Sequence, residues 1–195
     1  MTGPLALLSF AATAGVVVDG PAAAIRRVST FLTTWQQDAP TDLGGRSGSP
    51  STPLAGPAPR RTRLAARPGA MAPPGIARAL QLAGIALHDA ALLDTAERAM
   101  AACLAPGQLG LLVDGSLCHG WAGLLQVAAR FARDARTTHV ADRLAELAGP
   151  LLSGKDLTDG QTGLLEGNAG VVLALHTAAA QNAPVSDWDA CMLLT

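Results

Sequence analysis

Apolar residues recur in four runs along the chain, and each run begins at a glycine. The four runs begin at Gly3, Gly75, Gly123 and Gly170 and consist mostly of Ala, Leu and Val. Their spacing of apolar residues is typical of α-helices. Gly75 and Gly123 are 48 residues apart, and Gly123 and Gly170 are 47 residues apart. This spacing fits a repeat of two helices with their connections. The pattern therefore predicts an all-α fold built from helical hairpin repeats.

Each hairpin needs a second helix, which we expect at residues 21–37, 91–104 and 138–148. The first of these segments carries one helical stripe of apolar residues, which we expect in the core. The stripe consists of Ile25, Val28, Phe31, Leu32 and Trp35. The runs at Gly123 and Gly170 are each preceded by a Gly-x-Ala-Gly motif. Glycine is costly at an ordinary helix start. We therefore expect this motif where several helix ends meet around a common centre.

The distance from Gly3 to Gly75 is 72 residues, which is longer than one repeat, and the excess lies in residues 39–73. Eight of the 13 prolines fall between Pro40 and Pro74, which excludes a continuous helix or strand. The segment is also rich in Gly and Arg. We expect it to be a disordered insert without a nucleic-acid role. The chain then divides into a partial helical repeat at residues 1–38, this insert at 39–73, and the remaining repeats at 74–195.

Charge and cysteine content narrow the classes of function. A net charge of −1 argues against a nucleic-acid-binding protein, which would carry a basic face. Three widely spaced cysteines indicate a reducing cytoplasm rather than a disulfide framework. Residues 1–18 are apolar but have neither a basic start nor a signal cleavage site. No apolar stretch is long enough to span a membrane. We therefore expect a soluble, cytoplasmic protein.

The candidate chemistry lies at Cys118 and His119, just before an apolar run at residues 124–132. Thiolate and neutral imidazole are the usual protein ligands of zinc. Neighbouring side chains of a helix point about 100° apart, so both can reach one ion only from an irregular first turn. The preceding Asp114-Gly115 is typical of such a turn. From these residues alone, a buried and inert thiol next to a helix-start histidine stays open as the alternative.

Four segments of the C-terminal half resemble the lanthionine synthetase C-like (LanC-like) cyclases. They read PGIARALQLAG, SLCHGWAGLLQVA, LLEGNAGVVLAL and SDWDACMLL, and residues 1–38 are also similar to a segment of that family. The resemblance implies an α/α toroid of paired helices with a central zinc ion held by three protein ligands. It implies a reaction in which a peptide cysteine adds to a dehydrated Ser or Thr and closes a thioether ring. The implied partners are the dehydrated precursor peptide and a dehydratase.

Carried over by motif, Cys118 and His119 match two of the three zinc ligands. The third is the cysteine of a Trp-Cys-Tyr-Gly-x-Pro-Gly motif, and Ala70 stands in its place. The family's proton-transfer His and Asp belong to segments before Met1, so no catalytic residue is assigned. We expect a truncated, impaired chain that binds zinc weakly or not at all. Codons for residues 68–73 can spell Trp-Cys-Tyr-Gly in a shifted frame, which favours an out-of-frame translation of residues 39–73 over a genuine insert.

We interpret the other polar residues as structural. Neither of the two remaining cysteines matches the motif of the missing third zinc ligand. His176 is expected to be an ordinary helix histidine, and His88 and His139 to be solvated. Glu166 lies near a helix start, where the helix macrodipole favours a negatively charged side chain. We prefer this structural role to a role as a general acid. Cys103 falls in an outer helix and Cys191 in a terminal helix, whereas Arg78, on an inner helix, is left open as a substrate contact.

Three functions remain open on these grounds. The first is an impaired zinc-dependent cyclase of lanthipeptide biosynthesis. The second is a non-catalytic helical scaffold that binds a peptide or a partner protein. The third is a zinc-binding module in which Cys118 and His119 bind the ion without ring closure. The two alternatives differ from the first in that neither predicts a thioether product.

Overall fold

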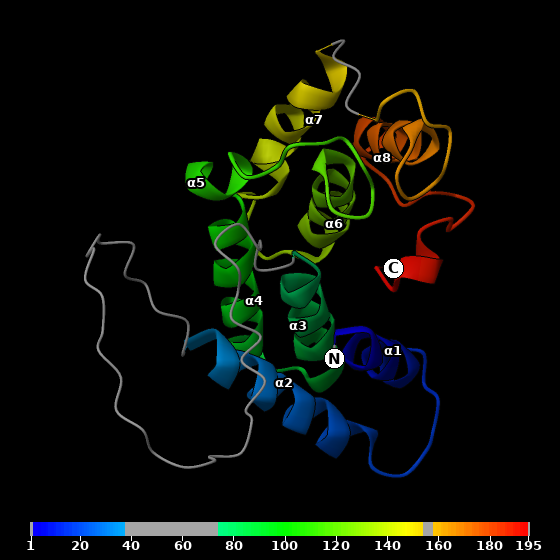
Figure 1. The fold of residues 1–195 in the computed structure, drawn as a ribbon. Helices are drawn as coiled ribbons and strands as arrows, with labels where there is room; N and C mark the ends of the chain where they lie inside the picture. The colour runs from blue at the N-terminus through cyan, green and yellow to red at the C-terminus, as the bar shows by residue number, and fades with distance from the viewer. Residues whose placement is uncertain (1, 38–73, 154–157, 195) are drawn as a thin grey trace, which may run out of the picture.

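A computed structural model describes residues 2–37, 74–153 and 158–194 (Figure 1). Within these ranges the chain forms helices and two 3-10 turns and has no strand, so the prediction of an all-α fold is confirmed. The elements are α1 (Thr2–Thr13), α2 (Pro21–Gln37), α3 (Pro74–Leu87), α4 (Ala90–Cys103), α5 (Pro106–Leu109), α6 (Trp121–Asp134), η1 (Ala141–Arg143), α7 (Leu144–Leu152), α8 (Asn168–Ala180) and η2 (Ala190–Met192). The insert predicted at residues 39–73 lies outside the described residues.

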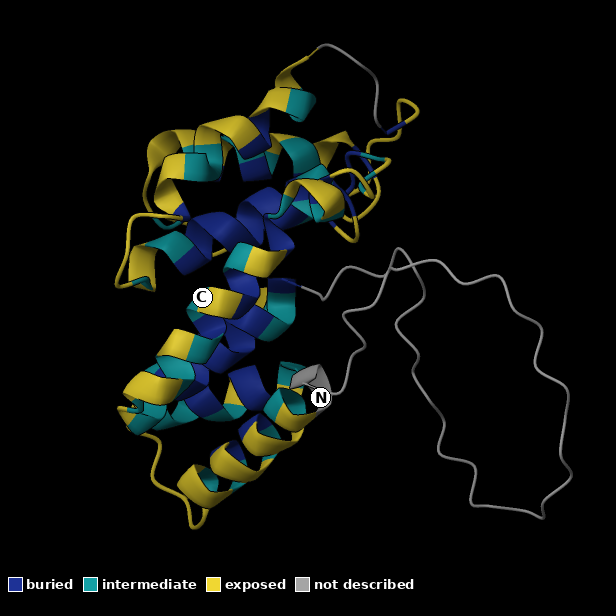
Figure 2. Ribbon diagram, turned by 90° about the vertical axis from the view of Figure 1, so that its left-hand side faces the viewer, coloured by how far each residue is buried: buried dark blue, intermediate teal, exposed yellow. Residues whose placement is uncertain are grey.

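The helices form successive hairpins. Helices α1, α3, α6 and α8 pack in a row in chain order, and α2, α4 and α7 each pack against the member of the row that precedes them (Figure 1). Buried residues follow the middle of this row (Figure 2). Helix α3 has neighbours on several sides, and its residues 77–84 are all buried. This arrangement accounts for the repeat spacing, whereas closure into a toroid stays a prediction.

The predicted helix bounds hold for α2, α4 and α6 to within a few residues. The helix expected over residues 138–148 is interrupted, because residue 138 is a bend, residues 139–140 form a turn, residues 141–143 form η1, and α7 begins only at Leu144. Two adjacent threonines, Thr137 and Thr138, disfavour helix there. The terminal helix expected around Cys191 is a single 3-10 turn, which ends at Leu193 in the left-handed conformation (φ 56°).

The stripe predicted on α2 is core only in part. Ile25 is fully buried and Val28 and Leu32 are half-buried, but Phe31 is 43% exposed. The side chain of Trp35 is not among those described. Helix α2 lies at the outside of the row against α1 and α3, so only part of the stripe has a helix to pack on. No helix in the described ranges is both long and apolar enough to cross a membrane.

Candidate functional site

The loop before α6 folds back on itself around Asp114. Its Oδ1 accepts a hydrogen bond from the Ser116 amide at 2.8 Å, an Asx turn of the kind that Asp-Gly predicts. Its carbonyl accepts the Trp121 amide at 3.0 Å. The Ser116 hydroxyl then accepts the His119 amide at 3.2 Å. Cys118 and His119 therefore leave the backbone from an irregular turn just before the helix, as the sequence predicts.

The Gly-x-Ala-Gly motif is explained by contacts with this loop. A Cβ on Gly120 would lie 2.5 Å from the Asp114 carbonyl oxygen, and a Cβ on Gly123 would overlap the Leu117 carbonyl oxygen. Any side chain would push the loop away from the helix start. Each of these two glycines therefore admits the loop that precedes its own helix, and the expectation that several helix ends meet around a common centre stays a prediction.

The loop before α8 repeats this construction 47 residues later. The Asn168 amide donates to the Gln161 carbonyl at 2.7 Å, as the Trp121 amide does to Asp114. A Cβ on Gly170 would overlap the Leu164 carbonyl oxygen and would lie 2.9 Å from the Leu117 Cβ. By this offset, Leu165 and Glu166 occupy the positions of Cys118 and His119 in the next repeat.

The two loops are joined through their backbones. The amides of Leu117 and Cys118 both donate to the Leu165 carbonyl, at 2.9 Å and 3.0 Å. This shared acceptor fixes the loop that carries Cys118 and His119 against the loop that carries Glu166. Side chains from equivalent positions of two repeats are thereby brought together.

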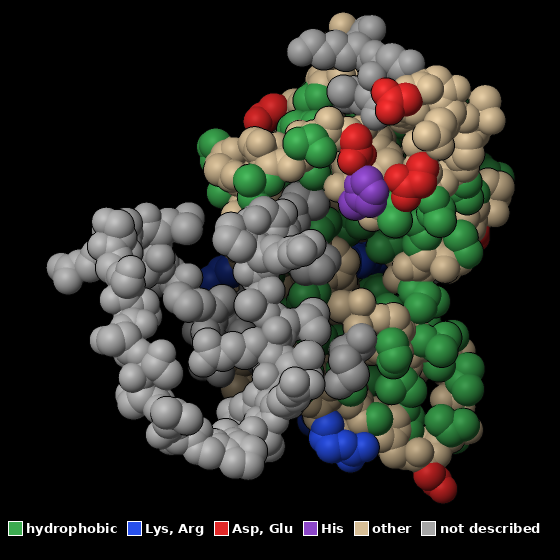
Figure 3. Space-filling model, viewed as in Figure 1, with side chains coloured by type: hydrophobic (Ala, Val, Ile, Leu, Met, Phe, Trp, Pro, Cys, Tyr) green, Lys and Arg blue, Asp and Glu red, His purple; other side chains and the backbone are tan. Residues whose placement is uncertain are grey.

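A cluster of four side chains forms where the loops meet. The His119 Nδ1 lies 2.9 Å from the Asp114 Oδ2, and its Nε2 lies 3.2 Å from the Glu166 Oε2. Cys118 precedes His119 in the same turn, and its amide donates to the Leu165 carbonyl at 3.0 Å. Asp114, Cys118, His119 and Glu166 are called the loop cluster below. Acidic side chains lie beside a histidine on the face shown in Figure 3.

The loop cluster is open to solvent. The His119 side chain is 61% exposed and the Glu166 side chain 50%, and Cys118 is exposed as well. Partial desolvation, together with the hydrogen bond and charge of Glu166 and the charge of Asp114, raises the pKa of the Cys118 thiol. The buried, inert thiol considered for Cys118 describes Cys103 instead, because burial raises the pKa of Cys103 to about 11.

Comparison with known families bears on what this cluster is for. Residues 73–193 match the family model described as lanthionine synthetase C-like protein. The chain belongs to this family. The match runs from the start of α3 through η2 and includes the whole loop cluster. Neither the curated proteins nor the solved structures contain a match to the chain.

The family resemblance implies a zinc ion, and two side chains of the LanC-like chain, Cys118 and His119, are of the types that bind zinc. His119 has a carboxylate, Asp114, at one ring nitrogen, as zinc-bound histidines commonly do. Its other nitrogen lies 3.2 Å from the Glu166 Oε2, and the exposed Cys118 precedes it in the same turn. Among the described residues, no group of three or more His, Cys, Asp or Glu is arranged as a metal-binding set. Ala70, at the third ligand's position, is outside them.

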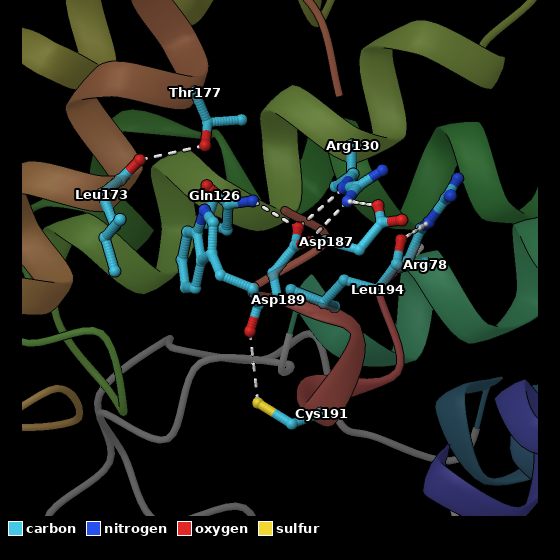
Figure 4. Close-up of polar contacts among 10 residues, drawn as sticks. Arg78, Gln126, Arg130, Leu173, Thr177, Asp187, Asp189, Cys191 and Leu194 are labelled. Carbon is cyan, nitrogen blue, oxygen red and sulfur yellow. Dashed lines mark hydrogen bonds and ion pairs between the residues drawn. The ribbon is translucent and has the colours of Figure 1, made fainter. Parts of the chain in front are cut away.

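A second polar cluster in the LanC-like chain is buried and holds the C-terminal segment (Figure 4). Asp189 is fully buried and accepts hydrogen bonds from Arg130 Nε at 2.6 Å and Gln126 Nε2 at 2.5 Å. Arg78 donates to the Leu194 carbonyl at 3.0 Å and pairs with Asp134 at 2.6 Å. Arg78 is therefore engaged with other groups of the chain, and its role as a substrate contact stays a prediction. Arg78, Gln126, Arg130 and Asp189 are called the C-terminal clamp.

The remaining candidates lie elsewhere. His88 and His139 are exposed, which confirms their interpretation as solvated. His176 is exposed on α8, eight residues after Asn168, or about 12 Å along the helix. The exposed Cys191 contacts the Trp188 carbonyl at 3.5 Å. Sequence reasoning missed the contact between Glu166 and His119, and the 47-residue offset between them was the signal that could have found it.

Proposed function

We propose that this LanC-like chain acts in lanthipeptide biosynthesis, on a dehydrated precursor peptide supplied by a dehydratase in the cytoplasm. The reaction is the addition of a peptide cysteine to a dehydrated Ser or Thr. A carbon–sulfur bond forms at the β-carbon as the carbon–carbon double bond becomes a single bond. The thiol gives up its proton, the α-carbon takes up a proton, and no atom is lost overall. The observation that carries the proposal is the exposed Cys118–His119 pair, fixed by the backbone tie to Leu165.

Each side chain of the loop cluster has a part in this proposal. Cys118 Sγ and His119 Nε2 would hold zinc, and Asp114 Oδ2 would accept a hydrogen bond from Nδ1 and so keep the Nε2 lone pair toward the ion. When bound, zinc supplies a charge that deprotonates a peptide thiol at neutral pH. The exposure of both side chains leaves room for a peptide to approach. The three free cysteines support a reducing compartment.

The proposal includes impairment, because Ala70 stands where the family motif has a cysteine. Ala70→Cys should therefore raise zinc affinity and permit slow ring closure, whereas Ala72→Cys, which adds a thiol outside the ligand position, should change neither. Zinc content is measured by elemental analysis after gel filtration. Ring closure is measured by mass spectrometry of the alkylated peptide, since a closed ring has one fewer thiol to alkylate. Equal zinc affinity in the unchanged and Ala70→Cys chains would contradict the impairment. Peptide binding without ring closure in Ala70→Cys would favour the non-catalytic scaffold.

A further inference from the structure

We propose that the backbone amides of Leu164 and Leu165 form a two-donor binding site for a carbonyl oxygen of the substrate peptide. The inference rests on the proposed function for the identity of the peptide. It goes beyond that function in naming the groups of this chain that hold the peptide backbone.

The loop before α6 already holds a carbonyl in this way. The amides of Leu117 and Cys118 both donate to the Leu165 carbonyl, at 2.9 Å and 3.0 Å. Both distances fall within the range, about 2.7–3.1 Å, at which backbone amides bind the oxygen of a reacting carbonyl in enzymes. Two neighbouring amides of this loop therefore converge on one acceptor that comes from outside the loop.

The loop before α8 has the same backbone construction. Residues 117–121 and 164–168 share the same order of turn, bend and helix start. The N-cap residue is Gly120 (φ −106°, ψ −161°) in one loop and Gly167 (φ −124°, ψ −173°) in the other. A Cβ on either glycine would lie 2.5 Å or 2.6 Å from the carbonyl oxygen six residues before it. The two amides before α8 are therefore placed to converge on one acceptor, as the two before α6 do.

Within the described residues, this second pair of amides has no acceptor. Neither Leu164 nor Leu165 donates its amide hydrogen to a backbone or side-chain oxygen there. Burial follows the same difference between the loops. Leu117, which Gly170 of the next loop covers, is 4% exposed, whereas Leu164 is 40% exposed and Leu165 50%. The amides before α8 are therefore open to an acceptor from outside the described chain.

A peptide carbonyl is the acceptor that this site fits. In the preceding loop the equivalent acceptor is itself a backbone carbonyl, and it comes from a segment that is not helical. An extended peptide presents its carbonyls in the same way. The exposed side chains of Leu164 and Leu165 add apolar surface on which the peptide side chains can pack.

The site adjoins the loop cluster, because Glu166 follows Leu165 directly. In the proposed addition, the electron pair of the carbon–carbon double bond moves toward the carbonyl oxygen of the dehydrated residue as the carbon–sulfur bond forms. The pair returns when the α-carbon takes up its proton. Two N–H groups directed at that oxygen stabilise the negative charge that develops on it.

The test replaces single backbone amides by esters in the full chain, which removes one N–H and keeps the side chain. The α-hydroxy analogue of leucine is placed by semisynthesis at Leu164, Leu165 or Leu117. The analogue of valine at Val17 is the control, because Val17 is 95% exposed and its amide also has no acceptor within the described residues. The probe is a short synthetic peptide with one dehydroalanine and no cysteine. Its binding is followed in amide spectra of the leucine-labelled chain, in which the esters identify the two signals.

We expect the peptide to shift the Leu164 and Leu165 amide signals of the unchanged chain. The ester at either residue should weaken binding about 2- to 10-fold, as loss of one hydrogen bond does, and should leave the urea midpoint unchanged. The Leu117 ester should lower the midpoint, because its amide already has an acceptor. The Val17 ester should change neither quantity.

No binding by the unchanged chain, or equal binding by the unchanged chain and both esters of the loop before α8, overturns the inference. Amide signals that shift with chain concentration before peptide is added would assign the site to a second copy of the chain, which also overturns it. Peptide binding through these amides without any ring closure, even in Ala70→Cys, would leave the site standing and reject the proposed function instead.

Discussion

The C-terminal clamp and the loop cluster both hold a carboxylate against a basic side chain from another part of the chain, but water reaches only one of them. Asp189 in the clamp is fully buried, whereas the Glu166 side chain is 50% exposed. A buried charge is tolerated only with its partners in place, while an exposed pair contributes little to stability. The comparison indicates that the clamp contributes more to the stability of the fold than the loop cluster does.

The strongest test of this contrast removes the buried charge. Asp189→Asn removes the buried counter-charge of Arg130 and leaves only the exposed Asp187 beside it. We therefore expect the free energy of unfolding to fall by about 3–5 kcal/mol. Urea unfolding followed by circular dichroism measures the change. The matched control is Asp187→Asn, because Asp187 lies 3.4 Å from the same arginine but its side chain is 66% exposed. A loss below about 1 kcal/mol is expected there.

Acid titration checks the same buried pair. Burial alone would raise the pKa of Asp189, but the hydrogen bonds and charge of Arg130 outweigh it and the pKa is lowered. A carboxyl with a lowered folded-state pKa stabilises the protein above its unfolded-state pKa, and this contribution is lost as the pH falls through the folded-state value. The unchanged chain should therefore lose more stability in acid than Asp189→Asn. If both chains lost the same stability as the pH falls, Asp189 would not be the carboxylate that stabilises the fold.

The fold was largely predictable, because a helical hairpin is encoded locally. The 47- and 48-residue spacings located α3, α6 and α8. The errors came from positions where neighbours decide the outcome. Phe31 follows the apolar stripe of α2 but has too little helix beside it to be buried, and the clamp joins residues 59 apart (Arg130 to Asp189), which no local pattern reports.

The stability of the chain should depend far more on the backbone packing around Gly123 than on the side chains of the loop cluster. Gly123→Ala would place a methyl group onto the Leu117 carbonyl oxygen, and backbone cannot move aside as a side chain can. We expect a loss of about 3 kcal/mol, measured by urea unfolding. Gly149→Ala is the control, since a Cβ there meets no atom within 4 Å in α7; it should gain about 0.5–1 kcal/mol from helix propensity. Equal effects of the two substitutions would show that the loop yields easily.

Only those residues of the candidate site that belong to a sequence motif could be predicted from the sequence. Cys118 and His119 could be named from their sequence, and the irregular turn that presents them was expected from Asp114-Gly115. Glu166 was assigned to a helix start because a lone carboxylate carries no motif. Its contact with His119 depends on the backbone tie between Leu165 and the preceding loop, a tertiary hydrogen bond that single-sequence patterns do not contain.

The smallest effect is expected on stability in the loop cluster itself. Glu166→Gln keeps the shape of the side chain and removes one charge from a contact in which both partners are at least half exposed. Solvent screening should therefore limit the change in unfolding free energy to less than about 1 kcal/mol. The measurement is urea unfolding of the metal-free chain with a chelator present. Asp159→Asn is the control, because it removes a charge from an exposed position of the same loop. If Glu166→Gln lost as much stability as Asp189→Asn, the loop cluster would stabilise the fold as the clamp does. A loss below about 1 kcal/mol would instead separate the two clusters, because only the clamp would then hold a charge pair that stabilises the chain.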